Sequence, residues 1–360
     1  MAKSKLRIGI VGTGGMANQH AEQFGKQKGV TLASCFDTVP GRAAEFAQRH
    51  GVARVAANLA DLLDQVDAVT IVTPDRFHHE GSLEVLRAGK HLLCEKPLTV
   101  TLAEAKSVAK LAKRASQAGQ IGMVNFSYRR SAALQKAIQL AGSGALGDLR
   151  HAHGFYLQSW IATPIWGHWT NEGWLWRMST KAGSAGVLGD VGCHLLDLMT
   201  SVTGEVAEVR CALGNFPKIG QDRKAYTKWK GQPLDANDTA IIELRFARGG
   251  LGVLHTSRWA TGHANHLRLE VHGTEGALMF DLDRSYDALD TCLGKDAAAA
   301  KWKTEQLKPA PSIYERFVRA IKTAEPDQPD LLRGAQIQAY LDACERSAAS
   351  GRWEKVLKWL

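Results

Sequence analysis

The stretch Leu6-Arg-Ile-Gly-Ile-Val-Gly-Thr-Gly-Gly-Met-Ala17 decides the fold of the first part of the chain. Its first six residues form an apolar run typical of a short buried strand, and a glycine-rich turn follows at once. We expect a helix over residues 18–28 and a second strand over 31–36. In the pattern G-x-G-x-x-A, Gly12 allows a tight turn, Gly14 admits a pyrophosphate and Ala17 lets the helix lie close to the strand. The helix N-terminus then offers N–H groups to phosphates.

Asp37 follows the expected second strand and supports this interpretation. A carboxylate at that point accepts hydrogen bonds from both hydroxyls of the adenosine ribose and repels a 2′-phosphate. This favours NAD over NADP. Arg42, five residues further on, could reach such a phosphate, so NADP remains the less favoured alternative.

Apolar strands and helical segments alternate as far as Val124, with further strands expected over 67–72, 90–94 and 120–124. Strands separated by helices of 10–15 residues imply a parallel sheet with right-handed crossovers. Ligands bind such a sheet beyond the carboxyl ends of its strands. Three polar segments follow those ends: Thr73-Pro-Asp-Arg-Phe-His78, Glu95-Lys-Pro97 and Asn125-Phe-Ser-Tyr-Arg129.

The pattern changes after Gly147, where short strands joined by glycine turns predict an open antiparallel meander. We expect these strands over 148–156, 206–213, 238–246, 251–259, 266–272 and 277–282, and closing helices over 312–322 and 333–350. The predicted fold is an α/β Rossmann domain over residues 1–126, followed by an α+β domain with an open, mainly antiparallel sheet over 127–360. The closing helices could return to the first domain.

An ordered set of motifs resembles the glucose–fructose oxidoreductase, inositol dehydrogenase and rhizopine catabolism (Gfo/Idh/MocA) family. The matching segments are Gly9 to Ala17, Thr73-Pro74 with His78, Ala88 to Pro97, Trp176-Arg177, Ala185 to His194 and Asn237 to Phe246. The family is one of NAD(P)-dependent sugar and polyol dehydrogenases. The resemblance maps its catalytic lysine and D-x-x-x-H motif onto Lys96, Asp190 and His194.

The predicted site follows from the motifs and the resemblance together. For the cofactor we expect Gly12, Thr13, Gly14, Gly15, Met16, Asp37, Thr38, Arg42, Thr73, Pro74, His78, Glu95, Lys96, Asn125, Trp176 and Arg177. For the substrate we expect Lys96, Tyr128, His153, Trp166, His168, Arg177, Asp190 and His194. No metal is expected.

A helix over 189–200 would place Asp190 and His194 on one face, because side chains at i and i+4 share a face. Five of the ten tryptophans lie within residues 159–177, which we interpret as a loop. These rings either stack on the apolar faces of a sugar ring or bury one another to hold the loop.

The resemblance implies that the enzyme oxidises a hydroxyl of a cyclic sugar, anhydrosugar or inositol. His194 is the candidate general base and Lys96 stabilises the developing alkoxide, with Asp190 orienting Lys96 or the substrate. Lys96 is the alternative proton acceptor if desolvation lowers its pKa. A glycosidase or eliminase that works through transient sugar oxidation, and a non-catalytic NAD sensor, are alternative interpretations.

Composition excludes several other classes. The chain has 360 residues and a net charge of +9, but its basic residues form no stripe, so we expect no nucleic-acid partner. The sequence contains no run of about 18 apolar residues, so we expect no membrane span. The start of the chain resembles a strand rather than a signal peptide. Six scattered cysteines without a C-x-x-C pair fit reduced thiols in the cytoplasm. We expect a homodimer or homotetramer.

Overall fold

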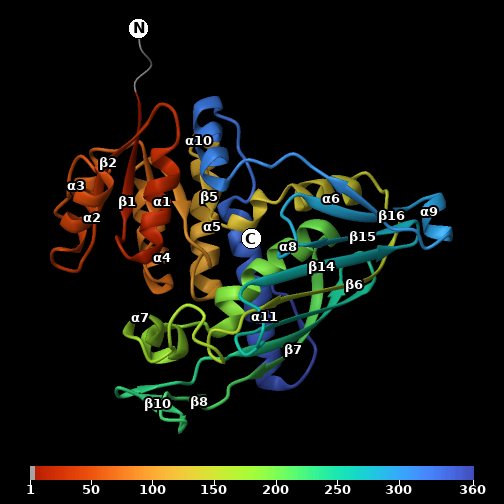
Figure 1. Ribbon diagram of the computed structural model, residues 1–360. Coiled ribbons are helices and arrows are strands. Elements are labelled where there is room, and N and C mark those ends of the chain that lie inside the picture. Colours follow the sequence, from red (N-terminus) through yellow and green to blue (C-terminus); the bar gives the residue numbers. More distant parts are fainter. Residues whose placement is uncertain (1–4) are drawn as a thin grey trace. The chain divides into compact units, whose positions relative to one another are not determined.

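The computed structural model describes residues 5–360, which form two compact units (Figure 1). Unit 1 contains the residues up to Ser127 together with Pro311–Gln338 and Trp359–Leu360. Unit 2 contains Tyr128–Ala310 and Ala339–Lys358. The chain therefore leaves unit 1 after Ser127, before the change of sequence pattern at Gly147, and returns to it at Pro311. Within residues 5–360 no helix combines the length and the apolar character that crossing a membrane requires.

Unit 1 is built on a five-stranded parallel sheet in the order β2-β1-β3-β4-β5. Its elements are β1 (Leu6–Val11), α1 (Gly15–Gly25), β2 (Val30–Phe36), α2 (Arg42–His50), α3 (Leu59–Leu63), β3 (Ala68–Ile71), η1 (Asp75–Phe77), α4 (His78–Arg87), β4 (His91–Cys94), α5 (Leu102–Gln117), β5 (Gly122–Val124), α10 (Ile313–Thr323) and the first part of α11 (Leu331–Ser350). The short helix α3, which begins at the capping residue Asn58, was not predicted from the sequence.

The sheet order reverses direction between β1 and β3, and this switch point is where ligands bind such sheets. Gly12 ends β1 there with φ +86°, a left-handed conformation that favours glycine. A Cβ at this position would lie 2.9 Å from the backbone of Val72 and Thr73. Only glycine therefore lets the end of β1 approach the end of β3 this closely.

Local signals fix where the main helices of unit 1 begin. Thr101 caps α5 and Ser312 caps α10, each in a reciprocal capping box with a glutamate three residues later. The amphipathic helix α10 then buries Tyr314 and Phe317 against Phe24 of α1, with edge-on ring contacts at 5.3 and 6.3 Å. This aromatic contact brings the late segment into the core of unit 1.

Unit 2 is built on a nine-stranded sheet in the order β17-β16-β15-β14-β6-β13-β12-β7-β18 (Figure 1). Its strands are β6 (Leu149–Leu157), β7 (Val206–Gly214), β12 (Thr239–Phe246), β13 (Leu251–Ser257), β14 (His266–Gly273), β15 (Gly276–Asp281), β16 (Ala288–Leu293), β17 (Lys303–Gln306) and β18 (Glu354–Lys355). Short pairs are formed by β8 (Lys218–Ile219) with β9 (Ala225–Tyr226) and β10 (Lys228–Trp229) with β11 (Gln232–Pro233).

The helical elements of unit 2 lie between these strands. They are α6 (Ala132–Gly142), α7 (Glu172–Leu175), η3 (Trp176–Met178), η4 (Thr180–Ala182), the π-helical turn η5 (Leu188–Gly192), α8 (Cys193–Thr203), α9 (Lys295–Ala298) and the second part of α11. The turn η2 (Ser127–Arg130) joins the two units along the chain.

The sheet of unit 2 is mainly antiparallel, as predicted, but the simple meander is wrong at its centre. The early strand β6 lies between β13 and β14, parallel to β13 and antiparallel to β14. The connection from β13 to β14 must therefore span two strand spacings, about 10 Å, which a tight turn cannot do. The pairs β8–β9 and β10–β11 and the strands β16, β17 and β18 were not predicted from the sequence.

The helix expected over 189–200 is also only partly correct. Residues Leu188–Gly192 form the π-helical turn η5, and the regular helix α8 starts at Cys193. Asp190 therefore lies in the π-turn and His194 in the first turn of the α-helix. Such π-turns occur often at functional sites, because they turn a side chain away from the direction that a regular helix would give it.

Candidate active site

The glycine turn of unit 1 is tied to the end of β2 through Asp37. The carboxylate oxygen Oδ2 accepts hydrogen bonds from the backbone N–H of Thr13 at 2.8 Å and from its hydroxyl at 2.9 Å. The other oxygen accepts from the backbone N–H of Val39 at 2.8 Å. Burial raises the pKa of Asp37. These hydrogen bonds and Arg42, 3.5 Å away, lower the pKa by more than burial raises it, so the net pKa lies below its ordinary value.

Several features of this edge suit a dinucleotide. Helix α1 starts after Gly14 without a side-chain cap, and a Cβ added at Gly14 or Gly15 would meet no atom within 4 Å. That open space lies against the N-terminus of α1, where backbone N–H groups attract phosphates. At the end of β3 the hydroxyl of Thr73 is buried without a hydrogen-bond partner among the described residues. The residues present therefore fit the pyrophosphate of NAD.

A buried polar network fixes the end of strand β4. Oxygen Oε1 of Glu95 lies 2.8 Å from Nε2 of His20 and 2.5 Å from the side-chain amide of Asn125. The other ring nitrogen of His20 bonds to the hydroxyl of Thr70, and the Asn125 amide also donates to Tyr314. Burial raises the pKa of Glu95, but His20, Lys96 and Asn125 lower it more strongly, to about 2. Glu95 is therefore a carboxylate whose hydrogen-bond network connects the strands β3, β4 and β5 with the helices α1 and α10.

Lys96 follows this anchored residue directly. It is partly exposed, and its backbone N–H donates to Oε2 of Glu95 at 3.1 Å. Pro97 comes next and is buried, and the Lys96–Pro97 peptide is cis. Glu95 thus fixes the backbone from which the lysine side chain extends, while Glu95 itself lies inside unit 1.

His78 is fully buried where helix α4 begins, and its ring bridges two loops. Nδ1 lies 2.8 Å from the carbonyl oxygen of Pro97, and Nε2 lies 2.8 Å from that of Thr73. Carbonyl oxygens only accept, so both nitrogens must donate and the ring is an imidazolium. Burial lowers the pKa of His78, but Cys94, Asp75 and the Pro97 carbonyl raise it to a net value of about 10.

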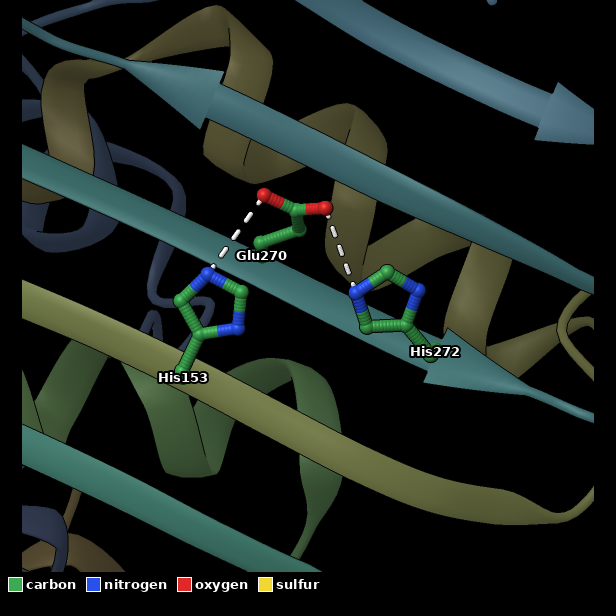
Figure 2. A group of neighbouring side chains, drawn as sticks. All are labelled: His153, Glu270 and His272. Atoms are coloured by element: carbon green, nitrogen blue, oxygen red, sulfur yellow. Dashed lines mark ion pairs between the residues drawn. The ribbon is translucent and has the colours of Figure 1, made fainter. Parts of the chain in front are cut away.

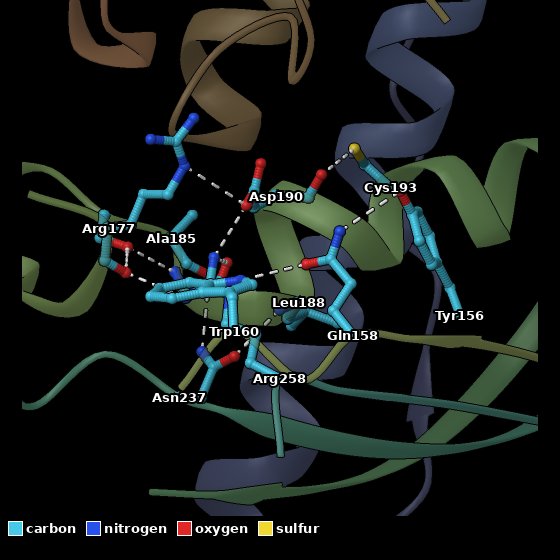
Figure 3. Close-up of polar contacts among 12 residues, drawn as sticks. Tyr156, Gln158, Trp160, Arg177, Ala185, Leu188, Asp190, Cys193, Asn237 and Arg258 are labelled. Atoms are coloured by element: carbon cyan, nitrogen blue, oxygen red, sulfur yellow. Dashed lines mark hydrogen bonds and ion pairs between the residues drawn. The ribbon is translucent and has the colours of Figure 1, made fainter. Parts of the chain in front are cut away.

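In unit 2, Asp190 faces two arginines (Figure 3). Its Oδ2 lies 2.9 Å from Nη2 of Arg258 and 3.9 Å from Nε of Arg177. The Arg258 side chain is fully buried, whereas 28% of the Asp190 side chain is exposed. Arg258 also donates to the carbonyl oxygens of Arg177 and Gly186, so it holds the π-turn and the preceding loop in one arrangement.

His194 lies one turn further along, against a network of hydroxyl and amide groups. Its ring meets the ring of Tyr128 edge-on at 4.8 Å. The hydroxyls of Tyr128 and Tyr156 are hydrogen-bonded to each other, and Asn265 bonds to both, at 2.8 and 2.5 Å. Burial, together with Tyr128 and Asp190, raises the pKa of Tyr156 well above its ordinary value, so its hydroxyl remains protonated. Donors and acceptors of this kind match a substrate with several hydroxyl groups.

The rings of the tryptophan-rich loop pack against one another, which is the second role predicted for them, and the stacking on a sugar ring stays a prediction. Trp160 stacks on Trp174 at 4.9 Å and is buried, and Trp169 is buried against Tyr226 and Trp229 of the short strand pairs. These rings hold the loop. Trp166 remains 42% exposed, and its ring stacks on Trp174.

The remaining predicted residues of this loop make local contacts. Arg177 places its guanidinium over Trp176 at 4.3 Å. His168 bonds through Nδ1 to the hydroxyl of Thr170 and lies against Trp169.

The structure contradicts one predicted site residue, His153. Side chains alternate between the two faces of a strand, and on β6 Tyr156 lies on the face of His194. His153 therefore points to the opposite face, where its ring contacts His151, His272 and Glu270. It cannot contact a substrate held by His194.

Several side chains of these networks were not predicted from the sequence. They are His20, Thr70, Tyr156, Gln158, Arg258 and Asn265. Arg258 left one weak signal, a charged residue near the end of the strand expected over 251–259. Asp197, three residues after His194, is not part of the site, because it forms a buried two-fold hydrogen bond with Arg129.

Two family models match the chain. The model described as "Oxidoreductase family, NAD-binding Rossmann fold" matches residues 6–123, and the GFO/IDH/MocA C-terminal domain matches residues 134–279. Together they cover well over half of the sequence and include the glycine turn, Lys96, Asp190 and His194.

Among curated proteins, levoglucosan dehydrogenase of Pseudarthrobacter phenanthrenivorans is 28% identical over 98% of both chains. D-glucoside 3-dehydrogenase of Escherichia coli is 28% identical over 71% of both. Among solved structures, levoglucosan dehydrogenase in complex with NADH superimposes with a TM-score of 0.86 at 27% identity, covering 99% of this chain and 100% of the other.

The charged state of His78 leads to a prediction about stability. Its folded pKa of about 10 exceeds the ordinary value of 6.5, so its contribution is complete below pH 6.5 and is lost as the pH rises toward 10. In His78→Gln we expect the stability difference from wild type to shrink by up to about 1.4 kcal/mol per pH unit over this window. Urea unfolding at pH 6.5, 7.5 and 8.5 measures it. His79→Gln is the control, and a pH-independent difference for His78→Gln would contradict the charged state.

Proposed function

Since the chain belongs to the Gfo/Idh/MocA family of NAD-binding oxidoreductases, we propose that it oxidises a hydroxyl of a cyclic sugar, anhydrosugar or inositol. The observation that carries this proposal is the polar network beside His194, in which two tyrosine hydroxyls and the amides of Asn265 and Gln158 are hydrogen-bonded together. A polyhydroxylated ring needs such closely spaced donors and acceptors. The relatives named for levoglucosan and D-glucosides support the same substrate class.

The catalytic roles follow from the chemistry of alcohol oxidation. When bound, NAD accepts the hydride that leaves the hydroxyl carbon. His194 takes the hydroxyl proton, because a neutral imidazole is a suitable base near neutral pH. Lys96 donates to the reacting oxygen and stabilises the developing alkoxide. Lys96 is the alternative proton acceptor.

For Asp190 the proposal keeps the role that the resemblance implies, which is to orient Lys96 or the substrate. The Asp190 carboxylate is engaged by Arg258 and lies near Arg177, which makes it a fixed anion beside His194. We propose that it accepts a hydrogen bond from a substrate hydroxyl and favours the protonated imidazole that forms during reaction. Arg258 acts through Asp190 and is therefore a positioning residue.

The cofactor would lie along the carboxyl edge of the sheet of unit 1. We propose that Gly12, Thr13, Gly14, Gly15 and Met16 bind its pyrophosphate, and that Asp37, Thr38 and Arg42 bind the adenosine ribose. Thr73, Pro74 and Lys96, with Trp176 and Arg177, would bind the nicotinamide half. His78, Glu95 and Asn125 act indirectly, because their polar atoms are already bonded inside unit 1.

The rest of the assignment concerns substrate contacts, assembly and compartment. Tyr128, Trp166, His168 and Arg177 remain proposed substrate contacts. We propose a homodimer or homotetramer. We place the protein in the cytoplasm, where its six buried thiols stay reduced.

The first test removes the proposed acid–base groups. Lys96→Ala and His194→Ala should each lower turnover about 10²-fold or more, because a positioned proton-transfer group contributes that much. NAD binding, measured by calorimetry, should persist. Lys106→Ala on the exposed face of α5 and His79→Ala are the matched controls. Near-normal turnover in either site variant would refute its assigned role.

The same assay distinguishes oxidation from redox-assisted cleavage. With monosaccharides, anhydrosugars, inositols and glycosides, a dehydrogenase accumulates one NADH for each substrate consumed. Substrate loss without NADH would instead support the glycosidase or eliminase.

Cofactor choice rests on Asp37. Asp37→Ala should weaken NAD and narrow the discrimination against NADP, because both the ribose acceptor and the negative charge are lost. Asp37→Asn removes the charge, replaces one acceptor oxygen by a donating amide group, and should relieve the repulsion of a 2′-phosphate. Steady-state kcat/KM with NAD and NADP gives the ratio, and an unchanged ratio in both variants would refute the assignment.

The dependence of kcat/KM on pH tests the proposed role of Arg258. Without its guanidinium a positive charge beside the Asp190 carboxylate is lost, so this carboxylate should stabilise the protonated form of His194, the proposed base, more strongly. In Arg258→Met the acidic limb of kcat/KM should therefore move to higher pH, and Arg258→Lys should move it back in part. A purely structural role would lower activity or stability without moving the limb.

A further inference from the structure

Three side chains on the exposed face of the nine-stranded sheet form a compact cluster (Figure 2). His153 of β6 lies directly opposite Glu270 of β14 in the antiparallel register, and His272 follows two residues along β14. Strand alternation places all three side chains on the same face. Nε2 of His153 lies 3.5 Å from Oε2 of Glu270, and Nε2 of His272 lies 3.2 Å from Oε1.

These atoms have the chemistry and spacing of metal ligands. All three ligand atoms lie within 4.8 Å of one another. Zinc binds imidazole nitrogen and carboxylate oxygen at about 2.0–2.2 Å in tetrahedral sites, which places neighbouring ligand atoms about 3.3 Å apart. The two histidine–glutamate separations, each to a different oxygen of Glu270, are close to that value, and the two histidine nitrogens lie within 4.8 Å of each other. We propose that His153, Glu270 and His272 bind a divalent transition-metal ion of the zinc class.

The surroundings are compatible with an ion that enters from solvent. The two histidine side chains are 37% and 35% exposed, whereas that of Glu270 is 14% exposed. Arg268 donates to Oε2 of Glu270 at 3.1 Å. A carboxylate has about four acceptor sites, so this bond orients Glu270 and leaves room for a metal, while the positive charge weakens its binding.

Three protein ligands leave the remaining coordination positions open to water or to a fourth donor. His151 is the nearest further ligand on this face, with its ring centroid 5.6 Å from that of His153 and 6.0 Å from that of His272. The site lies on the face of β6 opposite Tyr156 and His194. The metal therefore takes no part in oxidation, and it cross-links β6 to β14 at the centre of the sheet.

The sequence could not indicate this site. A zinc motif is read from ligands at short spacing, and here β6 and β14 are far apart in the chain. The expectation of no metal rested on the absence of paired cysteines, whereas this donor set contains none.

Equilibrium dialysis of the untagged, EDTA-treated chain against ZnCl2 tests the proposal. We expect one zinc per wild-type chain. His153→Ala, His272→Ala and Glu270→Gln should each lower the affinity at least tenfold, because each removes one of only three protein ligands. His79→Ala, a histidine of unit 1 bonded to Ser107, should bind as wild type does. NiCl2 should compete with zinc, and MgCl2 should not, since magnesium prefers oxygen ligands.

Two results would overturn the proposal: no zinc bound to the wild-type chain at 1 mM, or ligand variants that bind as His79→Ala does. Melting curves in EDTA verify that the variants are folded. Anomalous scattering at the zinc edge from wild-type crystals needs no variant. A peak between His153, Glu270 and His272 is expected, and a peak only elsewhere would also overturn the proposal.

Discussion

The close approach of strands β1 and β3 at Gly12 is the constraint on which the cofactor edge of unit 1 depends. The turn after β1 lies against the backbone of Val72 and Thr73, and any Cβ there would clash with it. Because the turn is this tight, Thr13 reaches the carboxylate of Asp37 at the end of β2. A larger residue at position 12 would separate the two strand ends and disperse the groups that the dinucleotide needs.

Each unit then uses buried charge to hold one partly exposed side chain of the candidate site. In unit 1 the buried carboxylate of Glu95, bonded to His20 and Asn125, fixes the backbone that carries Lys96. In unit 2 the buried guanidinium of Arg258 holds Asp190. A buried ionised group is costly unless it is fully bonded, so these partners leave little freedom of position. The same physical rule thus restricts the position of the lysine within unit 1 and of the aspartate within unit 2.

The sequence was a good guide where the signal is local and a poor one where it depends on tertiary structure. The strand–turn–helix unit at Leu6 to Ala17 and the parallel sheet follow from periodicity and glycine chemistry, which neighbouring residues determine. The insertion of β6 between β13 and β14 depends on pairing between distant segments, and no pattern within either segment encodes it. His153 was misplaced for the same reason, because its face is known only once the register of β6 is known. Arg258 was missed because its partners lie in loops remote along the chain.

Strand β6 shows how one element can support two unrelated chemistries. Tyr156 points to the face of His194, while His153 points to the face of Glu270 and His272. Because side chains an odd number of residues apart on a strand point to opposite faces, a change at His153 does not directly contact the proposed oxidation site. Any coupling between the two faces would have to pass through the backbone of β6. This backbone is hydrogen-bonded on both sides, to β13 and β14, and therefore moves little. A metal on the outer face would accordingly change the stability of this sheet more than the chemistry beneath it.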